Sequence, residues 1–92
     1  MIDPALRPSL PPQVRLQIDP VTVEPILLFP EGLLTLNSTA HEIVSRCDGQ
    51  ATVAEIIAAL AEEYDAPAEA LTADVTACLL DLRERHLLVL IP

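Results

Sequence analysis

The stretch Pro30–Ala40, PEGLLTLNSTA, decides the fold of this chain. Its Pro-Glu-Gly opening is typical of a turn, and its Leu-Leu-Thr-Leu centre is typical of a short apolar strand. The Asn-Ser-Thr end offers side-chain oxygens that can cap a helix, and Gly49 then stands about one short helix further on, where a helix stop is wanted. None of these residues suggests catalysis, so a strand leading straight into helices is most simply interpreted as a docking surface.

Two further strands are predicted before this stretch. Apolar and polar residues alternate over Gln13–Asp19, and a period of two indicates a half-buried strand. Asp19-Pro20 is a turn signal, and Val21–Phe29 is a second strand candidate. Because Pro25 has no N–H to donate, we expect this strand to be an edge strand or to be bulged there. The third short strand is Leu33–Leu36.

Three helices are predicted after it. The first fits a capping box from Thr39 to Glu42 if Thr39 takes the cap position, and Gly49 would form its C-cap. The second opens with a clear capping box, Thr52–Glu55, and Pro67 suits the first turn of the third. The clearest apolar stripe belongs to the third helix: Leu71, Val75, Cys78, Leu79 and Leu82. Residues 87–91 are continuously apolar and are expected to be a short extended tail over the core.

This order of elements predicts one small α+β domain. With 92 residues there is room for a single core. Residues 1–12 hold four prolines and no periodic pattern, and are expected to be a flexible tail before a domain over 13–92. Two or three small N-terminal antiparallel strands followed by a three-helix bundle make the predicted fold winged-helix-like.

The composition excludes several function classes. A net charge of −9, with five arginines and no lysine, argues against nucleic acid and anionic membranes as partners. The lack of lysine excludes Schiff-base chemistry. The sequence shows no signal peptide and no apolar run long enough to span a membrane, so a cytoplasmic protein is expected.

The residues that could carry chemistry are few. His41 and His86 have no partner at metal-ligand spacing, so no metal site is predicted. Cys47 and Cys78 lie on apolar faces, where a buried thiol acts as a small hydrophobe. No nucleophile–base grouping and no glycine-rich phosphate loop occur. We therefore expect neither an enzyme nor a cofactor.

A helix beside an unpaired strand edge forms a groove that can accept an extended peptide as an added strand. The third helix and the strand Leu33–Leu36 could form such a groove. Backbone hydrogen bonds would then give affinity, and apolar pockets would give selectivity.

An ordered set of short motifs from about Val14 to Leu88 resembles the PqqD family. These motifs are LLFPE at 27–31, LNSTA at 36–40, Ile43, CDG at 47–49, TVAEI at 52–56, Asp74-Val75 and Leu87-Leu88. There are departures: many relatives carry a glycine where His86 stands, and Glu24-Pro25-Ile26 replaces a common aromatic residue.

The resemblance implies a peptide chaperone in pyrroloquinoline quinone biosynthesis. PqqD-like proteins bind the precursor peptide PqqA and present it to the radical S-adenosylmethionine enzyme PqqE. In related recognition domains, the leader peptide adds as a strand beside the third strand and packs against the third helix. Carried onto this sequence, the peptide-binding residues are Leu33, Leu34, Thr35, Leu36, Leu71, Val75, Cys78, Leu79 and Leu82.

Other interpretations remain open at this stage. They are a winged-helix DNA-binding regulator, an acyl carrier protein, and a recognition domain for another modified peptide. The acidic residues of the third helix disfavour the first, and the lack of an Asp-Ser pair disfavours the second. A homodimer formed by exchange of N-terminal strands and a stable monomer are equal alternatives.

Overall fold

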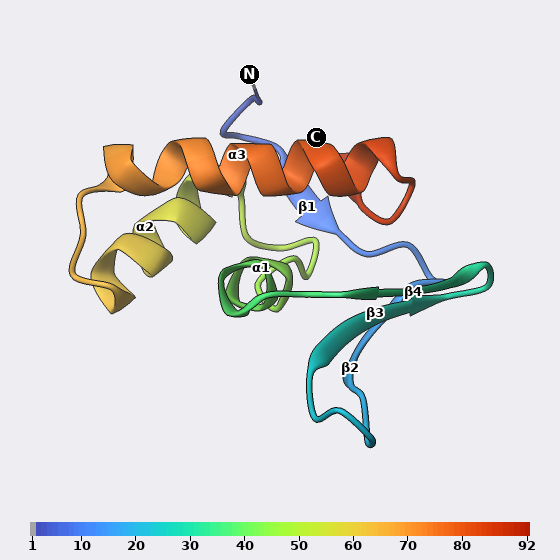
Figure 1. Ribbon diagram of the computed structural model, residues 1–92. Coiled ribbons are helices and arrows are strands. Elements are labelled where there is room, and N and C mark those ends of the chain that lie inside the picture. The colour runs from blue at the N-terminus through green and yellow to red at the C-terminus, as the bar shows by residue number, and fades with distance from the viewer. Residues whose placement is uncertain (1) are drawn as a thin grey trace.

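The computed structural model describes residues 2–92, and Met1 lies outside them. Five strands and three helices follow one another in these residues (Figure 1). In chain order they are β1 (Arg7–Ser9), β2 (Arg15–Ile18), β3 (Pro25–Phe29), β4 (Gly32–Thr35), α1 (Ser38–Val44), α2 (Val53–Glu63), α3 (Ala68–Glu84) and β5 (Val89–Ile91). The predicted α+β order, with strands first and three helices after them, is confirmed.

Strands β2, β3 and β4 form an antiparallel sheet in that spatial order. Leu16, Leu27 and Leu34 lie opposite one another across the three strands. Since side chains alternate between the two faces of a strand, these three share one face, and all three pack in or against the core. Figure 1 shows this sheet extending from one end of α1, with α3 running above α1.

The second predicted strand is wrong at its start, because β3 begins only at Pro25. The Asp19 carboxylate accepts a hydrogen bond from the Val21 N–H at 2.8 Å, and the Val23 N–H donates to the Asp19 carbonyl oxygen at 2.8 Å. These bonds hold Val21 and Val23 in a turn. Pro25 is therefore the first residue of its strand, a position that tolerates a missing donor.

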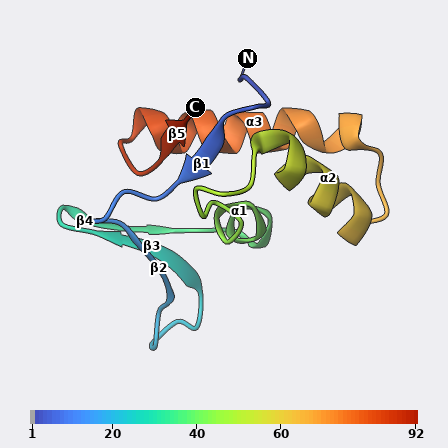
Figure 2. The same cartoon turned by 180° about the vertical axis from the view of Figure 1, so that it is seen from behind.

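The second sheet joins the two ends of the described chain. β1 pairs antiparallel with β5, with Pro8 opposite Leu90 (Figure 2). Pro8 is fully buried, and Ile2 is part of the core. The sequence predicted a flexible tail over residues 1–12, whereas the structure has a strand and two buried side chains there. The prediction failed because a three-residue strand whose partner lies about 80 residues away leaves no local periodicity.

Helix α1 begins two residues earlier than predicted. Asn37, and not Thr39, is its N-cap, and the Asn37 side chain accepts from the Ala40 N–H at 2.7 Å. The predicted capping box of α2 is confirmed: the Thr52 hydroxyl accepts from the Glu55 N–H at 3.1 Å, and the Glu55 carboxylate accepts from the Thr52 N–H at 2.8 Å.

Gly49 does not cap α1, which ends at Val44. Its φ is +79°, in the left-handed region, and its N–H donates to the Pro8 carbonyl oxygen at 2.9 Å. A Cβ at this position would lie 3.3 Å from the Ser9 Oγ atom. The glycine is therefore needed where the loop after α1 passes β1.

One apolar core joins the three helices to the three-stranded sheet and to the segment before β5. It contains Ile2, Val14, Leu27, Leu36, Ile43, Val44, Cys47, Val53, Ile56, Ile57, Leu60, Val75, Leu79, Leu82, Leu87 and Leu88. In the part of the chain that the structure describes, no helix has the length and apolarity needed to cross a bilayer.

Helix α3 ends in a Schellman motif with a histidine at the position that favours glycine. The His86 N–H donates to the Arg83 carbonyl oxygen at 3.0 Å, and the Leu87 N–H donates to the Leu82 carbonyl oxygen at 2.9 Å. His86 has a φ of +62°. His86, which stands where many relatives carry a glycine, thus adopts a backbone conformation that is unfavourable for any residue with a side chain.

We expect the substitution His86→Gly to stabilise the protein by about 0.5–1 kcal/mol, because glycine adopts this conformation without a steric penalty. Urea unfolding monitored by circular dichroism measures the effect. Arg85→Gly is the matched control, since Arg85 has a φ of −81°. It should destabilise the protein, and equal effects of the two glycines would contradict the assignment of strain to His86.

Candidate functional site

Strand β4 has one unpaired edge. It is the last strand of the sheet and, among the residues that the structure describes, pairs only with β3. The Leu36 N–H donates to the Pro25 carbonyl oxygen at 2.9 Å, and the register continues as Thr35 opposite Ile26 and Leu34 opposite Leu27. Hydrogen-bonded and non-hydrogen-bonded pairs alternate in an antiparallel ladder.

That alternation decides which backbone groups of β4 are free. Leu34 and Leu36 direct their N–H and C=O groups toward β3, so Leu33 and Thr35 direct theirs away from the sheet. An added strand could hydrogen-bond to these two residues. The edge predicted as the peptide-binding strand is therefore available within residues 2–92, through Leu33 and Thr35 in particular.

Strand β2 has the other unpaired edge of the same sheet, but its surroundings differ. Figure 1 shows β4 leading directly into α1, on the side of the sheet where α3 lies, with β2 on the far side. Among strands of this sheet, only the β4 edge runs into the start of a helix that packs against α3. The β4 edge thus adjoins helical surface that could supply pockets for side chains.

A groove lies between α1 and α3, just beyond the end of β4. Its volume is about 430 Å³. The residues that line it are Asn37, Thr39, Ala40, Ile43, Asp74, Ala77, Cys78 and Asp81. We call it the α1–α3 groove. Half of these residues are apolar, and the two aspartates stand on α3.

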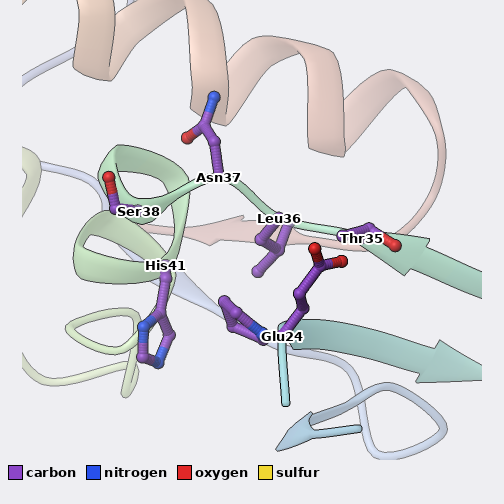
Figure 3. Close-up of a pocket in the computed structure, with 7 residues that line it drawn as sticks. Glu24, Thr35, Leu36, Asn37, Ser38 and His41 are labelled. Atoms are coloured by element: carbon purple, nitrogen blue, oxygen red, sulfur yellow. The ribbon is translucent and has the colours of Figure 1, made fainter. Parts of the chain in front are cut away.

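A second hollow of about 640 Å³ opens on the other side of the β4–α1 junction. It is lined by Glu24, Pro25, Thr35, Leu36, Asn37, Ser38 and His41. Figure 3 shows Asn37 pointing toward α3 and His41 pointing away from it. Asn37 lines both hollows, so the residue that caps α1 also separates them.

The nine residues predicted to bind the peptide occupy different environments. Leu33 and Thr35 are exposed, and Leu34 is half-buried. Leu71 and Cys78 on α3 are also half-buried. The remaining four belong to the core: Leu36, Val75, Leu79 and Leu82. In this arrangement the exposed and half-buried residues are the ones that a docked peptide can reach.

The two thiols are poor nucleophiles. Burial raises the pKa of the Cys47 thiol to about 12, and the nearby Cys78 and Asp48 add to the shift. Burial, together with the Asp81 carboxylate, also raises the pKa of Cys78. Both groups are therefore neutral near pH 7, and they contribute apolar surface rather than reactivity.

Sequence reasoning missed the residues that give the groove its charge. Asp74, Ala77, Cys78 and Asp81 follow the helical spacing i, i+3, i+4 and i+7, which places them on one face of α3. That spacing was visible in the sequence. In the sequence both acids count against DNA binding, and Asp74 also belongs to a motif of the family resemblance, but nothing local shows that α1 lies opposite them.

Comparison with known proteins gives consistent results. Residues 24–88 match the family described as coenzyme PQQ synthesis protein D (PqqD). A PqqA binding protein of Bradyrhizobium diazoefficiens is 34% identical over 95% of this chain and 84% of its own length. Another, from Rhodopseudomonas palustris, is 40% identical over 89% of this chain and 80% of its own length.

A solved structure is also similar. It is the solution NMR structure of the PqqD truncation of Methylobacterium extorquens PqqCD, described as a functional, stand-alone recognition element for ribosomally synthesised and post-translationally modified peptides. The TM-score is 0.77 and the identity 34%, over 89% of this chain and 87% of that one.

Proposed function

This chain belongs to the PqqD family, and from that membership we propose that it is a non-catalytic chaperone for the precursor peptide PqqA. The peptide would bind by adding a strand to the free edge of β4. The protein would then present it to the radical S-adenosylmethionine enzyme PqqE in pyrroloquinoline quinone biosynthesis, in the cytoplasm.

One observation carries this proposal: β4 offers unpaired backbone groups beside helical grooves, in a chain similar to a known peptide recognition element. Backbone groups of Leu33 and Thr35 would hydrogen-bond to the peptide regardless of its sequence. Side chains on alternate sides of the added strand would meet different surfaces. The backbone hydrogen bonds would thus provide affinity, and the contacts of side chains with the grooves would provide selectivity.

The alternative of DNA binding has little support in the structure. The exposed face of α3 carries Asp74 and Asp81, and carboxylates repel a phosphate backbone. The outward edge of β4 is neutral and has no basic side chain between Gly32 and Thr35.

Titration of ¹⁵N-labelled protein with synthetic PqqA tests the proposal. We expect the largest amide shifts at Leu33 and Thr35, with smaller shifts along the exposed face of α3. The Thr35 amide should also become protected from hydrogen exchange, because strand addition gives its N–H a partner. Absence of any shift at millimolar peptide would overturn the proposal, and shifts confined to β2 would overturn the assignment to β4.

A further inference from the structure

The α1–α3 groove combines apolar lining residues with two aspartates on one helical face. Ala77 and Cys78 of α3 line the groove together with Ala40 and Ile43 of α1. Asp74 and Asp81 are seven residues apart on α3, which places their Cα atoms about 10 Å apart along the helix axis.

No basic side chain is among the residues that line the groove. Within residues 2–92, Asp74 forms no ion pair. Asp81 is contacted by Arg85, whose Nε atom lies 3.2 Å from a carboxylate oxygen, and both side chains are more than half exposed. An exposed pair of this kind contributes little energy and is readily exchanged for another partner.

The groove also continues the free edge of β4. Asn37, which lines the groove, comes two residues after Thr35, the last residue of β4. A strand that pairs with Leu33 and Thr35 and extends toward α1 would therefore reach the groove with its next residues. The groove is thus placed to receive a side chain of the same peptide.

We propose that the α1–α3 groove selects a lysine or arginine of the precursor peptide, held between Asp74 and Asp81. This inference rests on the proposed function, because the peptide must first dock on β4. The aliphatic stem of the basic residue would cover Ala77 and Cys78, while its charged end stays near water. The occupant is chosen by charge complementarity: two aspartates and no basic residue line the groove, and only Asp81 has a cation nearby, the exposed Arg85.

Calorimetric titration with synthetic PqqA tests this inference. The double variant Asp74→Asn/Asp81→Asn should bind about three- to tenfold more weakly at low ionic strength, since two partly exposed ion pairs are lost. Asp74→Asn should cost more than Asp81→Asn, because Asp81 already has Arg85. The difference from the unsubstituted protein should shrink at about 1 M salt, where charges are screened.

A second set of peptides identifies the partner residue. Each lysine and arginine of PqqA is replaced in turn by norleucine, which keeps an apolar stem and removes the charge. For one of these peptides, the double variant and the unsubstituted protein should bind with the same affinity. The protein change and the peptide change together then weaken binding no more than either change alone. The matched control is Glu62→Gln/Asp65→Asn, which removes the same charge outside the groove and should leave affinity within about twofold.

Each outcome separates the inference from the proposed function. Unchanged affinity of the folded double variant, for a peptide that still docks on β4, overturns the inference alone. The same holds if every norleucine peptide binds normally. A change in self-association on sedimentation without a change in affinity would show the groove to be an interface between copies, which also overturns it. No binding by the unsubstituted protein overturns both.

Discussion

Replacement of Thr35 by proline is expected to weaken PqqA binding about tenfold while the domain stays folded. The Thr35 N–H points away from the sheet, so the substitution removes a donor for the added strand without breaking a bond to β3. The proline ring also obstructs the close approach of a neighbouring strand. Loss of one such hydrogen bond and of local fit is worth about 1–2 kcal/mol, or roughly tenfold in affinity.

The register makes this variant a sharper test than proline at Leu34. The Leu34 N–H bonds within the sheet, so proline there would damage β4 itself and weaken binding for either reason. Circular dichroism and a urea unfolding midpoint close to that of the unsubstituted protein would show that Thr35→Pro is folded.

Ile18→Pro is the matched control, because it introduces the same residue at the opposite edge of the same sheet. Ile18 lies in β2 opposite Pro25, and its N–H also points away from β3. Calorimetric titration should show an affinity near that of the unsubstituted protein. If Ile18→Pro weakens binding and Thr35→Pro does not, the peptide adds to β2 and the assignment of the site is wrong.

Deletion of residues 2–10 is expected to lower the free energy of unfolding by at least about 3 kcal/mol, since burying one large aliphatic side chain alone is worth about 1.5–3 kcal/mol. The deletion removes Ile2 and Pro8 from the buried interior and leaves β5 without a partner. It also removes the carbonyl oxygens of Pro4 and Leu6, which accept from the N–H groups of Ala54 and Val53 at 3.1 and 2.9 Å. A flexible tail would predict almost no change.

Urea unfolding of full-length and shortened chains measures this loss. Pro8→Asp tests the same contact at unchanged chain length, because it places a carboxylate at a fully buried position. Ala5→Ser in the same segment is the control, since Ala5 is exposed and the change should be within about 0.5 kcal/mol. If the deletion leaves the unfolding midpoint unchanged, β1 contributes nothing to stability.

Local signals explain which elements could be predicted. The Thr52–Glu55 capping box lies within four consecutive residues, so its chemistry is visible in the sequence and is confirmed in the structure. The α1 start was placed by three adjacent capping residues, and only geometry selected Asn37 over Thr39. The start of β3 was missed because the turn at Asp19 extends to Val23, held by hydrogen bonds to the Asp19 carboxylate and carbonyl oxygens that hydropathy does not record.

The sequence by itself determined the α+β order, the three helices, the acidic charge and the resemblance to the PqqD family, because these depend on neighbouring residues or on composition. Only the tertiary structure decided the β1–β5 pairing, the free groups of Leu33 and Thr35, and the α1–α3 groove. The β1–β5 pairing and the groove require segments far apart in the chain to meet, and the free groups of β4 depend on the hydrogen-bond register of its hairpin with β3. Asp74 and Asp81 line a groove only because α1 packs opposite them, and the spacing of residues within α3 does not reveal that packing.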